Sequence, residues 1–208
     1  LGTIERMSTQ QNAGGGVGVR KPIYKRWWFW VIATPVILFI ALVIYRIPAV
    51  REKEKTQQVV AQIHSQKLTI NDVNGEHLPP PPDPSQVDAT TEGVDANGNG
   101  IRDDVELAIF KKYPNSARIR AAELQYAKAL QMYLTKVFNS ETLVAVIQEE
   151  SRSNVCILDS NRSKEIDELV FNTDIRKKTQ EDLYRKFMTS YALPNSGYCD
   201  IDPKTFTN

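Results

Sequence analysis

The uncharged run at 27–45, WWFWVIATPVILFIALVIY, constrains this chain more than any other feature. A helix needs about 20 apolar residues to cross the hydrocarbon core of a bilayer, and this run is long enough. Trp27, Trp28 and Trp30 gather at one end and Tyr45 stands at the other, as aromatic residues do at membrane interfaces. The run is too long for the apolar region of a cleaved signal peptide, and no clear small-residue cleavage site follows it. The sequence therefore predicts a retained single membrane span.

A polar stretch at 95–106, DANGNGIRDDVE, carries the second strong pattern. Counted as a twelve-residue loop, it has side-chain oxygens at positions 1, 3, 5, 9 and 12 and glycine at position 6, which is the calcium-binding spacing of an EF-hand. Gly100 stands where such a loop turns sharply. The alternative is a polar turn whose acidic residues cap the following helix. The predicted ligands are Asp95, Asn97, Asn99, Ile101 through its backbone carbonyl, Asp103, and Glu106 with both carboxylate oxygens.

This stretch resembles EF-hand loops, and also the Asp/Asn/Gly calcium loops of dockerins and thrombospondin type 3 repeats. The resemblance covers only 95–106 and the helix that follows. Position 8, which is apolar in paired EF-hands, is Arg102 here, and the incoming helix is replaced by a stretch at 79–93 rich in proline, threonine and aspartate. The resemblance implies a solitary half EF-hand. Because Asn97 and Asn99 are neutral, we expect a structural Ca²⁺ site of weak affinity, with a Kd of about 10⁻⁴–10⁻³ M.

Charge and cysteine content narrow the classes of function. The formal net charge is +1 and the charges are mixed in sign, so nothing indicates an electrostatic nucleic-acid binder. Cys156 and Cys199 are the only cysteines, and neither has a partner at metal-ligand spacing. Beyond a membrane span, an even count predicts a disulfide, which would stabilise the domain by about 4 kcal/mol in the chain-entropy model. The alternative is two free buried thiols in a cytosolic domain.

Basic residues flank both ends of the span, so charge alone does not orient it. They are Arg20, Lys21, Lys25 and Arg26 before it, and Arg46, Arg51, Lys53 and Lys55 after it. We expect a cytoplasmic N-terminus because the preceding tail is short. In that orientation the cysteines meet an oxidising space and the weak calcium loop meets millimolar calcium. The C-terminal domain is therefore expected to be extracytoplasmic, either periplasmic or extracellular.

The rest of the chain divides into a disordered tail at 1–26, a juxtamembrane helix or stalk at 46–67, and a tether at 68–94. Pro48 suits the first turn of the stalk helix. The tether holds four consecutive prolines, which favour an extended polyproline II spacer. The only strand that the sequence indicates is a short one near 68–73. As lone histidines, His64 and His77 are expected to be solvated.

Residues 95–208 form the predicted folded domain. The apolar spacing is helical throughout, which predicts an all-α domain of about five helices opened by the calcium loop. The first helix is expected from Ile101 to Lys112. Four further helices are expected to begin at caps, namely Ser116, Ser140, Ser163 and Thr173.

The sequence shows no catalytic motif. It lacks a phosphate-binding glycine loop, HExxH and GxSxG, and the domain has no histidine to activate Cys156. An acidic pair such as Glu149-Glu150 usually lies on a solvated helix face. We therefore expect no enzyme, but a membrane-anchored calcium-binding module with a structural, binding or assembly role, joined to a protein partner in an envelope complex or to its own copies. The alternative is a membrane-anchored cell-wall glycan hydrolase using Glu149 or Glu150, which would need a deep acidic cleft.

Overall fold

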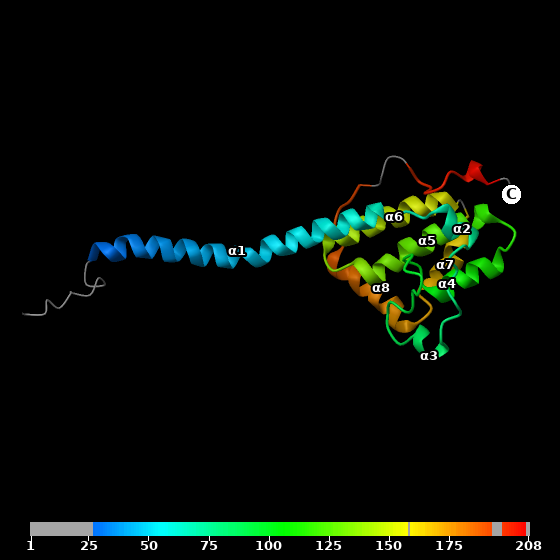
Figure 1. Cartoon of the computed structure of the whole chain (residues 1–208), viewed down its shortest axis with the longest axis horizontal. Helices are drawn as coiled ribbons and strands as arrows, with labels where there is room; N and C mark the ends of the chain where they lie inside the picture. The colour runs from blue at the N-terminus through cyan, green and yellow to red at the C-terminus, as the bar shows by residue number, and fades with distance from the viewer. Residues whose placement is uncertain (1–26, 158, 193–196, 207–208) are drawn as a thin grey trace, which may run out of the picture. The chain divides into compact units, whose positions relative to one another are not determined.

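The computed structural model describes residues 27–157, 159–192 and 197–206, and no strand occurs in these ranges. The all-α prediction is confirmed, while the predicted tail at 1–26 lies outside the described residues. The chain divides into two compact units, Leu1–Val50 and Arg51–Asn208. The elements (Figure 1) are α1 (Trp27–Ser65), α2 (Ile70–Asn74), α3 (Pro84–Val87), α4 (Asp103–Lys112), α5 (Ala117–Lys136), α6 (Ser140–Ile157), α7 (Ser160–Val170), α8 (Asp174–Phe187) and a 3₁₀ turn at Pro203–Thr205.

Helix α1 is the one helix in the described ranges that is long and apolar enough to cross a membrane. Its apolar side chains between Trp27 and Tyr45 are exposed, and Phe39, for example, is 66% exposed. Lipid can cover such a surface, whereas water would leave it unfavourably hydrated. Pro35 and Pro48 lie inside the helix. Pro48 therefore does not begin a separate stalk helix, because α1 runs on to Ser65.

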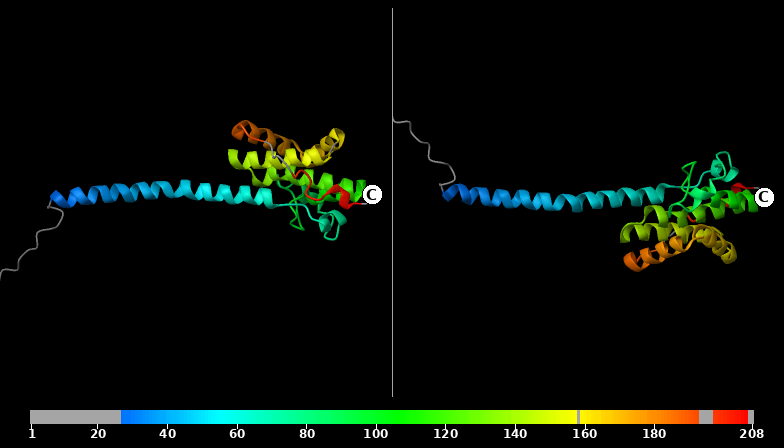
Figure 2. Two further views of the ribbon diagram at one scale, coloured as in Figure 1. Left: turned by 90° about the horizontal axis from the view of Figure 1, so that it is seen from above. Right: turned by 90° about the horizontal axis from the view of Figure 1, so that it is seen from below.

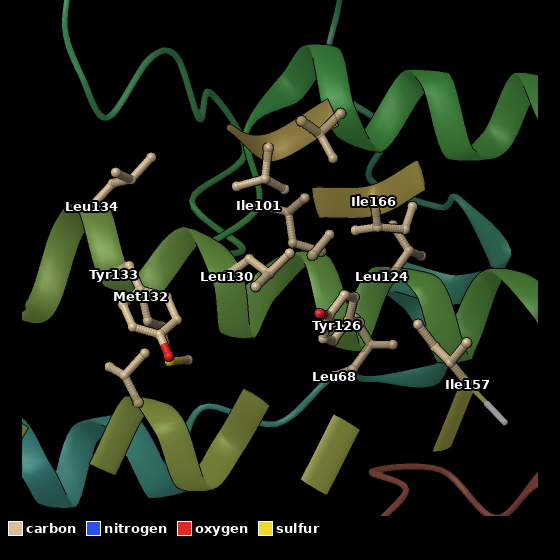
Figure 3. Packing of buried hydrophobic residues seen from close by; sticks show 14 of the residues in the cluster. Leu68, Ile101, Leu124, Tyr126, Leu130, Met132, Tyr133, Leu134, Ile157 and Ile166 are labelled. Atoms are coloured by element: carbon tan, nitrogen blue, oxygen red, sulfur yellow. The ribbon is translucent and has the colours of Figure 1, made fainter. Parts of the chain in front are cut away.

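Helix α5 is the centre of the second unit. It contacts α2, α4, α6, α7 and α8, and Figure 2 shows it running beside α6. Because neighbours surround it, every residue from Arg120 to Leu134 is buried. Figure 3 shows Ile101 and Ile166 pointing toward α5 beside its core side chains. Each fully buried aliphatic side chain contributes roughly 1.5–3 kcal/mol of transfer free energy, so this core is the main stabilising feature of the unit.

Residues 51–94 belong to the same unit as the helical domain. Ile63 and Val73 are fully buried in its core, so the stretch expected to be stalk and spacer packs against the domain. The strand expected near 68–73 is wrong, because this stretch contains helix α2. Thr69 and Asp72 form a capping box there, in which each side chain accepts a hydrogen bond from the other's backbone N–H.

The end of the predicted spacer is held by Arg176 of α8, which is 1% exposed. Its Nη2 donates to the carbonyl of Val87 at 2.7 Å and its Nε to the carbonyl of Thr91 at 2.9 Å. Its Nη1 pairs with Oδ1 of Asp88 at 2.5 Å. These contacts satisfy a buried guanidinium and fix residues 87–91 to the beginning of α8.

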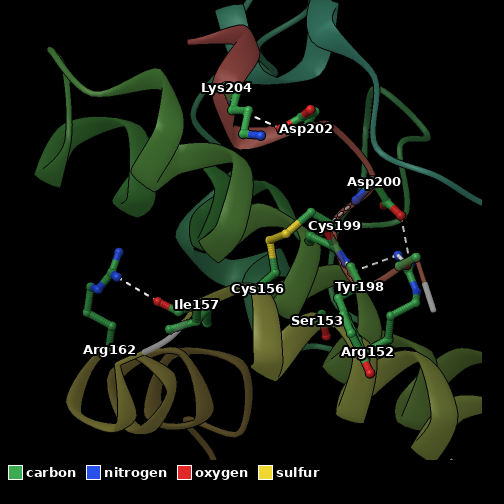
Figure 4. The surroundings of a disulfide bond; sticks show 12 residues. Arg152, Ser153, Cys156, Ile157, Arg162, Tyr198, Cys199, Asp200, Asp202 and Lys204 are labelled. Carbon is green, nitrogen blue, oxygen red and sulfur yellow. Dashed lines mark hydrogen bonds and ion pairs between the residues drawn. A yellow bond between two sulfur atoms is a disulfide. The ribbon is translucent and has the colours of Figure 1, made fainter. Parts of the chain in front are cut away.

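The predicted disulfide joins Cys156 and Cys199, whose Cα atoms are 5.3 Å apart (Figure 4). It links the last turn of α6 to the tail that follows α8, across 43 positions of sequence. The tail is also held by hydrogen bonds. The carbonyl of Tyr198 accepts from Nε2 of Gln125 at 2.7 Å and from Nη1 of Arg152 at 2.9 Å. Residues 197–206 are therefore an integral part of the domain.

Candidate calcium site and the neighbouring charges

The loop that begins at Asp95 folds around that side chain. The backbone N–H of Asn99 donates to Oδ1 of Asp95 at 3.2 Å, and that of Gly100 donates to Oδ2 at 2.9 Å. Gly98 and Gly100 have φ values of 70° and 87°. Glycine adopts this left-handed region without the clash that a Cβ would cause, so glycine at these positions lets the chain wrap around the carboxylate.

Glu106, in the first turn of α4, closes the loop. Its Oε2 accepts from Nδ2 of Asn97 at 3.0 Å, and its Oε1 accepts from Nδ2 of Asn99 at 3.0 Å. Glu106 is 1% exposed. Burial raises the pKa of Glu106 to about 7, against the opposing effect of the two amide hydrogen bonds. The two amide hydrogen bonds place both oxygens of Glu106 toward the loop, as the predicted bidentate ligand requires.

Asp103 is the other buried acid of the loop, and it is 1% exposed. Its Oδ1 accepts from the backbone N–H of Ala96 at 3.0 Å. Its Oδ2 is buried without a hydrogen-bond partner among the described residues. Burial raises the pKa of Asp103, and the charges of Asp95 and Asp104 add to that effect. An unpaired buried carboxylate oxygen is costly, and a bound cation would satisfy it.

The residues fit a calcium ion in their chemistry. Every predicted ligand atom is oxygen, which suits a hard cation. In this structure the amide orientations are set by further hydrogen bonds: Oδ1 of Asn97 accepts from the N–H of Asn99 at 3.2 Å, and Oδ1 of Asn99 accepts from the N–H of Ile101 at 2.8 Å. To present carbonyl oxygens to an ion beside Glu106, the amides would have to turn by 180° and give up these bonds. Ile101 has no ligand atom in its side chain, which is fully buried in the core, so only its backbone carbonyl could bind an ion.

The structure brings Asn97 and Asn99 to Glu106, but it does not gather the predicted ligands into an ion site. In the described ranges, no group of three or more His, Cys, Asp or Glu side chains is placed to hold a metal ion. The predicted set depends instead on two asparagines and one backbone carbonyl, besides its three acids. Calcium binding at 95–106 therefore stays a prediction.

Arg102, which departs from the EF-hand pattern at position 8, has a structural role that the sequence analysis missed. It is 1% exposed, and its Nη1 and Nη2 donate to the carbonyls of Val170 and Leu169 at 3.0 and 2.9 Å. A guanidinium satisfies the free carbonyls at the end of α7 and favours the negative end of the helix dipole. This side of the loop therefore contacts α7, where a paired EF-hand would have its second loop.

Glu149 is buried, so the expectation of a solvated face is wrong for it. Its Oε1 is 2.9 Å from Nδ1 of His64, and its Oε2 accepts from Nη2 of Arg152 at 2.6 Å and from Nζ of Lys67 at 3.1 Å. Burial opposes ionisation, but the hydrogen bonds from His64 and Arg152 outweigh it and lower the pKa of Glu149. The prediction that His64 is only solvated is also wrong, because it contacts α6 from the end of α1.

Glu150 is the next residue of α6, about 100° further around the helix than Glu149. It accepts hydrogen bonds from the hydroxyls of Tyr133 and Tyr184, and burial raises its pKa. Glu149 lines a cavity of only about 10 Å³. A sugar ring does not fit in that volume, so the geometry at Glu149 gives no support to the glycan hydrolase alternative.

Comparison with known proteins adds no family to this picture. No protein-family model matches the chain, and neither a curated protein nor a solved structure matches it. The functional argument therefore depends on the chemistry of the residues themselves.

Proposed function

We propose that this chain is a single-pass membrane protein whose C-terminal domain is a calcium-stabilised binding or assembly module outside the cytoplasm. The observation that carries the proposal is the convergence of Asn97 and Asn99 on the two oxygens of Glu106. The apolar surface of α1 supports membrane attachment. The disulfide supports an oxidising compartment, because such bonds are rare in the cytosol.

Calcium would stabilise the fold at the beginning of α4. Asp103 and Glu106 are both 1% exposed, so their ionised forms are disfavoured in the domain without a cation. A bound Ca²⁺ would supply the positive charge that these buried carboxylates lack. Because Glu106 belongs to α4 and Ile101 to the core, binding there would fix the loop to the helical unit.

The proposed role is recognition, either of a protein partner in an envelope complex or of a second copy of this chain. Glu149 is saturated by cationic neighbours, which leaves it unsuited to act as a general acid. The domain also presents exposed apolar side chains: Ile175 on α8 is 69% exposed and Val155 on α6 is 46% exposed. Such residues are available for contact with another protein surface.

Limited proteolysis of intact cells that express the full chain tests both halves of the proposal. A protease that does not cross the membrane is added with external calcium or with a calcium chelator. We expect the domain to resist cleavage in calcium and to be cut within 95–106 after chelation, because the freed carboxylates repel one another. The Glu106→Gln variant should be cut under both conditions.

The two ways of failing are distinct. Cleavage that occurs only after the cells are permeabilised would place the domain on the cytoplasmic side. External cleavage at the same rate with and without chelator would instead remove the calcium-binding part of the proposal and leave the membrane orientation intact.

A further inference from the structure

A pocket of about 590 Å³ lies between the first half of α5, the end of α6 and the C-terminal tail. Its volume falls within the roughly 300–1,000 Å³ that is typical of small-molecule sites. The described residues that line it include neither a predicted calcium ligand nor Glu149. Its lining is largely apolar and includes Ile119, Ala122, Val155, Ile157, Ile201 and Phe206.

The tail wall of this pocket is fixed by several bonds. The disulfide attaches Cys199 to α6, and both of its cysteines line the pocket. Gln125 of α5 holds the tail twice: its Nε2 donates to the carbonyl of Tyr198 at 2.7 Å, and its Oε1 accepts from the N–H of Asp200 at 2.9 Å. Figure 4 shows the tail running past the disulfide, with Arg152 bonded to it. The pocket is therefore a built cavity with a covalently attached wall.

Two arginines give the pocket a positive side. Arg162 donates to the carbonyl of Ile157 at 2.7 Å and is 3.3 Å from Oδ2 of Asp159, so its charge is partly matched. Arg118 is exposed and lines the pocket, and in the described part of the chain its side chain has no hydrogen bond or ion pair. A guanidinium binds a carboxylate in a bidentate, charge-assisted geometry. An apolar cavity beside an unpaired guanidinium is complementary to a ligand with an apolar body and one anionic end.

We infer that this pocket binds a single-chain anionic amphiphile of the fatty-acid class, with its alkyl chain between α5 and the tail and its carboxylate on Arg118. The alkyl chain replaces water against Ile119 and Phe206, which contributes in proportion to the apolar area covered. Both walls belong to the second unit and the lining holds no predicted calcium ligand, so the inference does not depend on calcium binding.

Photolabelling of the full chain in lipid nanodiscs tests the assignment. The probes are an alkanoic acid with a photoreactive group at the end of its chain, and an alkyl trimethylammonium with the same chain. Labelled peptides are identified by mass spectrometry. We expect the acid to label peptides that contain 116–125 or 198–206 at least about tenfold more than the cation does. One charge-assisted hydrogen bond to Arg118 raises the affinity by about that factor.

Two variants and one control make the test specific. Arg118→Glu should lower labelling by the acid about tenfold or more. Val155→Trp should block the pocket without disturbing the core, because Val155 is 46% exposed. Lys111→Glu makes the same charge change at an exposed lysine on α4 outside the pocket lining, and should leave labelling unchanged. Far-UV circular dichroism checks that each variant is folded.

Three results would overturn the inference. They are labelling confined to the span at 27–45, equal labelling of the pocket peptides by the acid and the cation, and labelling that neither Arg118→Glu nor Val155→Trp reduces in folded protein.

Discussion

The side-chain amide of Asn99 donates to Oε1 of Glu106 at 3.0 Å, which joins the middle of the polar loop to the first turn of α4. The matching bond from Asn97 to Oε2 makes the closure symmetrical. Because α4 begins inside the loop, a single carboxylate belongs both to the helix and to the loop. The conformation of the loop and the position of the helix end are therefore coupled through Glu106.

Glu106→Gln should remove the response of the domain to calcium. At a calcium concentration about ten times the Kd, binding stabilises the native chain by about 1.4 kcal/mol, and the variant should gain nothing because it loses the bidentate ligand. The measurement is thermal unfolding by far-UV circular dichroism, with and without calcium. Glu76→Gln, a change at an exposed glutamate outside the loop, is the matched control and should respond like the native chain.

Arg176→Met should destabilise the domain by about 3–5 kcal/mol, because it leaves the carbonyls of Val87 and Thr91 without their donor. Arg185→Met, at an arginine of the same helix whose side chain is 75% exposed, should change stability by less than about 0.5 kcal/mol. Urea unfolding measures both values, and hydrogen exchange should quicken at 87–91 in the first variant. Similar losses in both variants would mean that Arg176 does not hold this segment.

The sequence signals that succeeded are local ones. Ser116 and Thr173 were predicted to begin helices and do so, since each hydroxyl accepts from a backbone N–H three residues on, at 3.4 and 3.3 Å. A cap needs only a short polar side chain at the correct offset, and a short window of sequence contains that information. The cysteine pairing was likewise predictable, because only one pairing is possible.

Local patterns also gave wrong helix caps where two nearby polar residues could cap the same helix. Ser163 was predicted to cap α7, but Asp159 does so by accepting from the N–H of Asn161 at 3.0 Å. Ser163 instead lies inside the helix, and its hydroxyl donates to a carbonyl of the preceding turn. At α6, the predicted cap Ser140 is preceded by Asn139, whose Oδ1 accepts from the N–H of Thr142 at 3.0 Å. In each case the earlier Asp or Asn supplies the acceptor.

The sequence does not predict which residues far apart along the chain contact each other. His64 and Glu149 are 85 positions apart, and Arg176 meets residues 87–91 from a similar separation. A single sequence carries no periodicity or spacing that pairs such groups, so His64 looked solvated and 68–94 looked like a spacer. The Thr69 and Asp72 capping box is different: its spacing was present in the sequence and predicts the helix that was missed.

Cys156→Ser combined with Cys199→Ser should lower the stability of the domain by about 4 kcal/mol in the chain-entropy model, because the unfolded chain gains the freedom of an open loop. A reductant should lower the melting temperature of the native chain toward that of the double variant. The double variant itself should not respond to reductant. A native chain that melts at the same temperature with and without reductant would contradict a disulfide that restrains the tail.

Glu123→Gln should change how stability depends on pH. Glu123 is 1% exposed, and burial raises its pKa from 4.5 to about 7. The folded chain therefore holds a proton that the unfolded chain releases, so native stability falls as pH rises between these values. The variant should be more stable than the native chain at pH 8 by on the order of 2–3 kcal/mol, and nearly equal to it at pH 4.

Thermal unfolding between pH 4 and pH 8 measures this difference. Glu181→Gln, at an exposed glutamate of α8, is the control and should follow the native pH dependence. A Glu123→Gln curve parallel to the native one across the whole range would show that Glu123 does not carry the effect.

Calorimetric titration of calcium into the full chain tests the central claim most directly. The protein is held in nanodiscs of zwitterionic lipid, with empty nanodiscs as the blank and Glu106→Gln as the matched variant. We predict one ion per chain with a Kd of about 10⁻⁴–10⁻³ M, and no binding by the variant. Absence of heat at millimolar calcium, together with an unchanged melting temperature, would contradict the account.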